Sequence, residues 1–142
     1  MNSETRALVA YRMERAREAL SEANLLLQAG HLNTYVNRLY YACFYAVSAL
    51  LVIRGISTSK HAHLRSLLHR DFVKTGMIPT ELGRHFDRLF STRQEGDCAD
   101  FVVFKADEVR PWLNESKAFV DYIQGLIDRS EPSTTDSKGS TS

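Results

Sequence analysis

The densest group of side chains able to bind an anion lies between residues 60 and 74 of this sequence. Three histidines and four basic residues share that stretch with a single carboxylate, Asp71: His61, His63, His69, Lys60, Arg65, Arg70 and Lys74. His61, Arg65 and His69 follow at intervals of four residues, so a helix would place them in one basic stripe. This pattern favours a site for phosphate or an RNA backbone at a helix N-terminus. The alternative is a solvated outer face.

A zinc site is not expected at these histidines. His61 and His63 are two residues apart and therefore point to different sides of a helix. No cysteine or carboxylate lies near enough in the sequence to complete a tetrahedral shell. The chain also has no glycine-rich phosphate loop and no GxSxG motif. We therefore expect no metal ion and no cofactor.

Two further polar groups are candidates for binding or catalysis. Asn37 and Arg38 interrupt an apolar stretch, where a charge must reach solvent or find a partner. Arg38 either pairs with a carboxylate such as Asp97 or Asp100, or faces a ligand. Arg93 belongs with these two aspartates to the most polar irregular segment, which is either a functional loop or an ordinary connector. We predict that Arg38, Arg93 and Asp97 converge in one polar cleft, with Lys60 and His61 at its rim.

These residues must be positioned by helices, and the central one is predicted at residues 32–54. Apolar residues are consecutive from Tyr40 to Val47 and cover every face of a helix, which is typical of a buried helix. Its length is near the minimum for crossing a membrane. Asn37, Arg38 and the tyrosine hydroxyls instead favour the centre of a helical bundle.

Apolar residues at helical spacing predict four more helices, at residues 3–28, 60–74, 80–90 and 106–127. Ser3 is the expected N-cap of the first and Gly30 its C-terminal stop, while Ser57-Thr58-Ser59 should cap the third. Residues 91–105 are predicted to be a loop. Pro111 predicts a kink or a fresh start in the last helix. The fold class is thus all-α, an up-and-down bundle of about five helices over residues 1–128, followed by a disordered polar tail at 129–142.

Composition limits the class of protein further. With 142 residues and 44% apolar residues, the chain has material for one domain. Eighteen basic against 17 acidic residues give a net charge of +1, which argues against binding nucleic acid by bulk charge. Cys43 and Cys98 form no CxxC motif, and the N-terminus mixes acidic and basic residues. We expect a cytoplasmic protein without a membrane anchor.

Several motifs occur in an order that resembles the HEPN domain family. Asn37-Arg38-Leu39-Tyr40-Tyr41-Ala42-Cys43-Phe44 is followed by Ala49-Leu50-Leu51, Lys60-His61, Phe72-Val73-Lys74-Thr75-Gly76 with Ile78-Pro79, and Arg93 with Gly96-Asp97. The resemblance covers roughly residues 15–127. It implies a helical bundle that commonly dimerises and is often encoded beside a minimal nucleotidyltransferase. Many HEPN proteins are metal-independent RNases and act as the toxin of such a pair.

The usual catalytic signature of that family is an arginine followed about four to six residues later by a histidine. Arg93 is the matching arginine, but Cys98, Ala99 and Asp100 stand where the histidine would fall. Close relatives also tend to carry a tyrosine where this chain has Cys98. Arg54 and His61 do have six residues between them, but they join the second helix to the third, which is the wrong place in the fold. We treat that match as chance.

The resemblance therefore suggests a toxin-like or nucleotide- or RNA-binding partner of a minimal nucleotidyltransferase, and a candidate metal-independent endoribonuclease. Arg93 is the candidate cation for a phosphorane, and Asp97 or His61 the candidate base. The candidate binding residues are Arg38, Asn37, Lys60 and Arg65. The alternative is a non-catalytic helical module that binds another protein. We also predict a homodimer, because the aromatic residues are more than a bundle of this length readily hides: Tyr35, Tyr40, Tyr41, Phe44, Tyr45, Phe86 and Phe90.

Overall fold

The computed structural model describes residues 1–98 and 103–130, and of residues 94–98 only the helical backbone. Within these residues every regular element is a helix, so the predicted all-α bundle is confirmed. The elements are α1 (Ser3–Ala29), α2 (Leu32–Ile53), α3 (His61–Leu68), the π-helical η1 (His69–Val73), α4 (Thr80–Cys98), α5 (Ala106–Val109) and α6 (Trp112–Arg129). The predicted tail, residues 129–142, lies outside the described residues from 131 onward.

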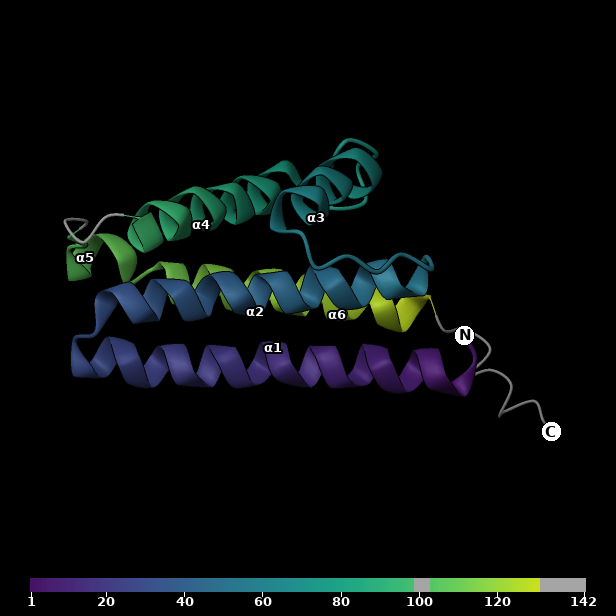
Figure 1. The fold of residues 1–142 in the computed structure, drawn as a ribbon, viewed down its shortest axis with the longest axis horizontal. Coiled ribbons are helices and arrows are strands. Elements are labelled where there is room, and N and C mark those ends of the chain that lie inside the picture. The colour runs from purple at the N-terminus through teal and green to yellow at the C-terminus, as the bar shows by residue number, and fades with distance from the viewer. Residues whose placement is uncertain (99–102, 131–142) are drawn as a thin grey trace.

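The helix α2 occupies the middle of the bundle. In Figure 1, α1 lies on one side of α2 and α6, and α3 and α4 lie on the other, with the N-terminus and the end of α6 at the same end. Its contacts run to α1, α6 and α4, and Leu39, Tyr40 and Cys43 are among its fully buried residues. By length and composition α2 could cross a membrane, but most of it is buried by the other helices. This is the arrangement expected of a central bundle helix.

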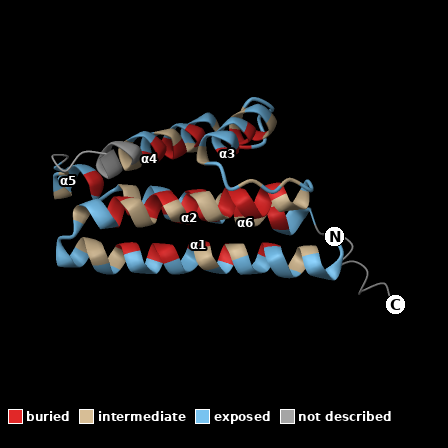
Figure 2. Ribbon diagram, in the orientation of Figure 1, coloured by how far each residue is buried: buried red, intermediate tan, exposed pale blue. Residues whose placement is uncertain are grey.

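The helix α1 is amphipathic, with its buried residues toward α2 and its outer face exposed (Figure 2). The predicted N-cap was wrong by one residue, because Asn2 rather than Ser3 accepts the Thr5 N–H, at 2.7 Å. Asparagine is an equally good cap, since its side-chain oxygen reaches the same free amides. Gly30 ends the helix as predicted, with a left-handed φ of 82° that a residue with a Cβ rarely adopts.

The third predicted helix is divided into α3 and η1. Its N-cap is Lys60, whose own side chain makes no capping bond, but Thr58 of the predicted capping run accepts the Lys60 N–H at 3.2 Å. At His69 the helix widens into a π-helical turn, a feature often found at functional sites. Gly83 of α4 lies against this turn, because a Cβ there would come within 3.0 Å of Val73 Cγ2. The glycine therefore lets α4 approach η1 closely.

The end of the chain differs from the prediction in one place and agrees in another. The helix α4 continues to Cys98, so the loop predicted from Ser91 was wrong over its first half. Helical propensity explains the difference, because Arg93, Gln94 and Glu95 are good helix formers. The predicted fresh start at Pro111 is confirmed, since α5 ends at Val109 and α6 begins at Trp112. The Tyr35 hydroxyl donates to the Val109 carbonyl at 2.7 Å and fixes this corner to α2.

The aromatic residues behind the homodimer prediction are largely inside the bundle. Tyr35, Tyr40 and Phe86 are fully buried, and Phe90 is 8% exposed. Tyr41, Phe44 and Tyr45 are half-buried and pack against the core. The premise that these rings exceed what one chain can hide was therefore wrong for four of the seven. Tyr40 is covered by α3 and α4, and Tyr35 is enclosed where α5 meets α6. The homodimer itself stays a prediction.

Candidate functional site

Tyr40 is the residue around which the candidate site is built. It is fully buried on the side of α2 that faces α3 and α4. Its hydroxyl lies 2.7 Å from Nδ1 of His61, at the start of α3. Arg93, near the end of α4, holds its Cζ 4.7 Å from the centroid of the same ring. Tyr40, His61 and Arg93, hereafter the Tyr40 cluster, therefore join three helices at one point.

The ring of His61 is held by aromatic neighbours as well as by this hydrogen bond. It stacks on Phe44 with centroids 4.7 Å apart and on Tyr40 at 5.6 Å, and Tyr41 meets its edge at 5.8 Å. His61 is half-buried as a result. Packing on two sides fixes the orientation of the imidazole, which is what a group that transfers protons requires.

The Tyr40 hydroxyl can match either protonation state of His61. Burial raises the pKa of Tyr40 and outweighs the opposing effect of Arg93, so the phenol stays neutral. When Nδ1–H donates to the phenol oxygen, the neutral imidazole keeps its lone pair on Nε2, which can then accept a proton. When the imidazole is protonated, Nδ1–H makes the same donation to the phenol oxygen. The contact therefore persists as His61 gains or loses a proton.

Arg93 lies on a helix rather than in the loop predicted for it. It is half-buried, and its guanidinium reaches back over Tyr40 and toward Tyr41, with Cζ 5.9 Å from the centroid of the second ring. A cation over a tyrosine face is attracted by the ring quadrupole. Asp97 lies on the last turn of α4, but its side chain falls outside the described part of the chain, as does all of Asp100.

A small pocket with polar and apolar walls opens beside Arg93. It has a volume of about 200 Å³ and lies between α2 and the end of α4. Its walls include Asn37, Arg93 and Thr92, together with Asn33 and Thr34 from the first turn of α2. The structure thus brings Asn37, a predicted binding residue, to the same pocket as the predicted catalytic arginine. Amides, hydroxyls and a guanidinium suit a polar or anionic ligand.

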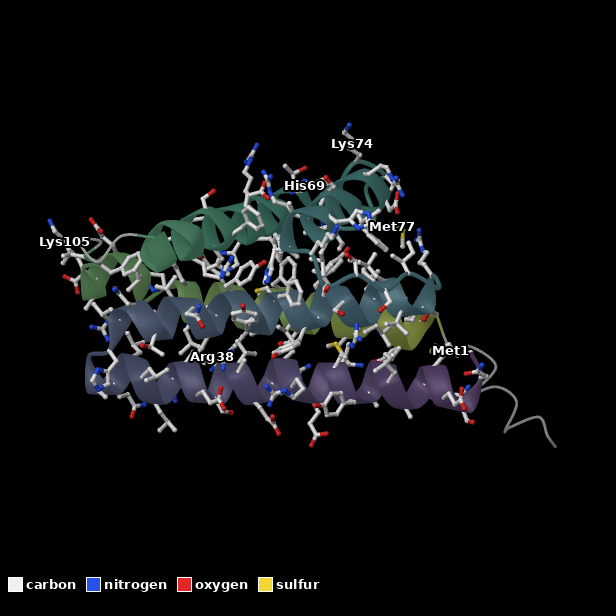
Figure 3. The ribbon with its side chains drawn as sticks, viewed as in Figure 1. Met1, Arg38, His69, Lys74, Met77 and Lys105 are labelled. Carbon is white, nitrogen blue, oxygen red and sulfur yellow. The ribbon has the colours of Figure 1, made fainter. Side chains whose placement is uncertain are left out.

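Arg38 and Arg93 do come together, at Tyr41. The Cζ of Arg38 lies 5.3 Å from the Tyr41 centroid, and Arg93 approaches the same ring. The carboxylate partner of Arg38 is Glu22 of α1, 3.3 Å away, a residue that the sequence analysis did not consider. Figure 3 shows Arg38 at the junction of α1 and α2. Of the three residues predicted to converge, Arg38 and Arg93 therefore meet at Tyr41. The position of the Asp97 side chain stays a prediction.

The basic stripe predicted on the third helix does not exist as one surface. His61 points into the bundle, whereas Arg65 and His69 share one carboxylate oxygen of Asp87, at 2.7 and 2.9 Å. The sequence could not show this pairing, because Asp87 belongs to α4. Lys60 is exposed beside His61. In Figure 3, His69 lies in the outer layer and Lys74 projects away from the bundle.

A buried polar chain in the core was missed by the sequence analysis. His85, only 5% exposed, has Nε2 2.8 Å from the Ser116 hydroxyl and Nδ1 2.7 Å from the Arg88 guanidinium. Ser116 also lies near the thiol of Cys43, whose pKa burial raises to about 12. Burial, helped by the charge of Arg88, lowers the pKa of His85 to about 4. A signal was present, since His85 falls on the apolar face of α4 between Leu82 and Leu89.

The buried pair of Ser116 and His85 resembles a serine nucleophile with its base, but the directions of their hydrogen bonds exclude that chemistry. Glu115 lies 3.4 Å from His85 Nδ1, so the three residue types are those of a triad. An arginine only donates, however, so Nδ1 must accept from Arg88 and Nε2 must carry the proton. His85 therefore donates to Ser116 and cannot deprotonate it. Ser116 is also fully buried, away from any substrate.

Comparison with known proteins identifies the family. The family model described as "HEPN domain" matches residues 9–126, which is most of the chain. The chain belongs to the HEPN domain family. A "UPF0332 protein" of Thermotoga maritima is 42% identical over 89% of this chain and 96% of its own length. Two proteins of Methanocaldococcus jannaschii are each named "Putative toxin". One is 29% identical over 89% of this chain and 94% of its own length. The other is 27% identical over 77% of this chain and 74% of its own length.

This HEPN protein shows no metal centre in the residues that the structure describes. Among them, no three histidine, cysteine, aspartate or glutamate side chains gather closely enough to hold an ion. Its relatives place it in a group that includes proteins named as toxins. The arrangement that its own geometry offers for chemistry is the Tyr40 cluster, with an imidazole and a guanidinium on one phenol.

Proposed function

We propose that this HEPN protein is the toxin of a two-gene module and that its Tyr40 cluster cleaves RNA without a metal ion. The observation that carries the proposal is that His61 and Arg93 both contact Tyr40. These two residues are 32 positions apart in the sequence and lie on different helices, α3 and α4. An imidazole next to a guanidinium is sufficient for phosphodiester transfer when RNA supplies its own nucleophile. The names of the archaeal relatives support the role of a toxin.

In the proposed reaction the ribose 2′-oxygen attacks the neighbouring phosphorus and the bond to the 5′-oxygen breaks. His61 accepts the 2′-hydroxyl proton, and the leaving 5′-oxygen takes up a proton from the protonated imidazole. Arg93 stabilises the negative charge that builds on the phosphorane oxygens. The products are a 2′,3′-cyclic phosphate and a 5′-hydroxyl, so no water or metal-bound hydroxide is consumed in this step.

In this scheme His61 replaces the histidine that the family signature places after the arginine. The Tyr40 hydroxyl holds Nδ1 through both protonation states, so Nε2 is the nitrogen proposed to exchange the proton with the substrate. Asn37 binds the sugar or phosphate in the pocket beside Arg93, and Lys60 contributes charge at the start of α3. Asp97 stays the alternative base. Arg65 has a smaller role than the sequence suggests, because Asp87 already neutralises it.

We propose a minimal nucleotidyltransferase as the antitoxin partner and a homodimer as the free state, both in the cytoplasm. A toxin of this kind needs a partner that silences it, and symmetric dimers are the commonest assembly of soluble proteins. Size-exclusion chromatography with light scattering tests the dimer. Co-expression with the gene adjacent to this one tests the partner, because a silencing protein must restore growth and co-purify with this chain.

The proposed function is tested by inducing the protein in a bacterial host and following growth and total RNA. Wild-type protein should arrest growth and fragment RNA, and Arg93→Ala should do neither. Arg84→Ala is the matched control, since Arg84 is an exposed arginine on the same helix. Arrest by the Arg93→Ala protein would contradict the proposal. Arrest without RNA fragments would favour the non-catalytic interaction module.

A further inference from the structure

Two half-buried tyrosines next to the Tyr40 cluster each carry an arginine over the ring. Tyr41 and Tyr45 are one turn apart on α2, with centroids 6.1 Å apart. Arg15 of α1 lies over Tyr45, with Cζ 5.2 Å from the centroid. Arg38 lies over Tyr41 at 5.3 Å, and Arg93 approaches that ring from α4. Arg15, Arg38, Tyr41, Tyr45 and Arg93, hereafter the Arg-Tyr face, form one continuous surface over three helices.

The charge of the Arg-Tyr face is only weakly positive. Glu18 lies 2.9 Å from Arg15, and Glu22 lies 3.3 Å from Arg38. These two carboxylates therefore offset the charges of Arg15 and Arg38. A surface that held a polyanion by charge alone would carry a larger excess of positive charge. Recognition on this face must come mainly from the aromatic rings and from the planar guanidinium groups above them.

Resting on the proposed function, we infer that the Arg-Tyr face binds single-stranded RNA by stacking two bases, one at Tyr41 and one at Tyr45. Unpaired bases stack on aromatic rings and on guanidinium planes, whatever their sequence. The 6.1 Å between the rings exceeds the ~3.4 Å rise of a stacked strand, so the two bases are splayed apart. The strand is thereby extended, as in-line attack by a 2′-oxygen requires.

Continuity with the Tyr40 cluster favours RNA over a protein partner, although tyrosine and arginine are also frequent in protein interfaces. Arg93 belongs to both surfaces, and Tyr41 touches both the Tyr40 ring and His61. A base at Tyr41 thus lies next to the residues proposed to act on its phosphate.

The test is fluorescence anisotropy with an eight-nucleotide 2′-O-methyl oligouridine, which lacks the nucleophile and cannot be cleaved. An abasic oligomer of the same length measures the contribution of phosphate alone. We expect at least tenfold tighter binding of the oligomer with bases. Tyr41→Leu and Tyr45→Leu should each lose on the order of tenfold, while the Phe variants keep most of the affinity. Tyr122→Leu is the control, since Tyr122 is a half-buried tyrosine on α6 that donates to the Met77 carbonyl.

Several results would overturn the inference. The inference is overturned if the abasic oligomer binds as tightly as the oligomer with bases. It is also overturned if the Tyr41→Leu and Tyr45→Leu proteins bind RNA as tightly as the wild type. Wild-type protein that binds no RNA, but loses a dimer on Tyr41→Leu, would assign the face to protein contacts. If the leucine variants do not fold, photocrosslinking of 4-thiouridine RNA to wild-type protein must modify peptides containing Tyr41 or Tyr45, and crosslinks elsewhere refute the inference. Tyrosine-dependent binding without cleavage of unmodified RNA would leave this inference standing and reject the proposed catalysis.

Discussion

Lowering the pH should destabilise this protein through one buried histidine. The pKa of His85 is about 4 in the folded chain, against an ordinary value of 6.5. Between these values the unfolded chain binds a proton that the folded chain does not, so stability falls as the pH drops. Above pH 6.5 the effect is absent. Below pH 4 the loss in the free energy of unfolding reaches its limit of about 3 kcal/mol. At pH 5 the loss is already about 2 kcal/mol.

The perturbation that isolates this effect is His85→Gln. A glutamine amide can donate to Ser116 and accept from Arg88, as the neutral imidazole does, but it does not titrate. Glu115 is the carboxylate nearest the ring and Arg88 the nearest cation, and both remain in the variant. The difference between the two proteins therefore reports His85 alone, while acid effects of other carboxylates cancel.

The assay is urea unfolding of both proteins at pH 7.5 and at pH 5. We expect the wild type to lose about 2 kcal/mol more than His85→Gln over this interval. His63→Gln should behave like the wild type, since His63 is exposed. Parallel pH dependence of the wild type and His85→Gln would refute the reasoning. It would mean that the core opens to hydrate the imidazolium or that the histidine is not buried.

Two further predictions concern the scaffold. Gly30→Ala should lower the free energy of unfolding by about 1 kcal/mol, because alanine must adopt the left-handed φ of 82°, and thermal melting measures it. Gly125→Ala is its matched control and should not destabilise, since only Arg129 Nη1, at 3.4 Å, lies near the new Cβ. In a Cys98→Ser background, Cys43 should resist a thiol reagent at pH 8 until urea is added, because it is fully buried with a pKa of about 12. Rapid reaction in the native protein would contradict that burial.

Local patterns in the sequence were sufficient for most of the fold. The apolar run from Tyr40 to Val47 identified α2 as the central helix, and Gly30 and Pro111 marked real helix boundaries. These signals act within a turn or two of helix, so one sequence carries them. The first-turn cap at Asn2 and the extension of α4 to Cys98 were missed because neighbouring residues offer nearly equivalent caps and propensities.

The candidate site depended on contacts between helices, and its residues were only partly predictable. Arg93 and Asn37 were singled out from the sequence, and the structure places them at one pocket. The pairing of Arg65 with Asp87 and of Arg38 with Glu22 could not be foreseen, because each joins different helices. The bond from Tyr40 to His61 was missed for the same reason. Its two residues lie 21 positions apart, and only the packing of α3 against α2 brings them together.

The most direct test of the Tyr40 cluster is cleavage of single-stranded RNA by purified protein in EDTA, with the product ends analysed. The wild type should yield 2′,3′-cyclic phosphate and 5′-hydroxyl ends, and a 2′-deoxy substitution at the scissile position should stop the reaction. Arg93→Ala should be slower by at least about 100-fold, while Arg84→Ala keeps full activity. Cleavage that requires a metal ion, leaves a 5′-phosphate or persists in Arg93→Ala would contradict the account.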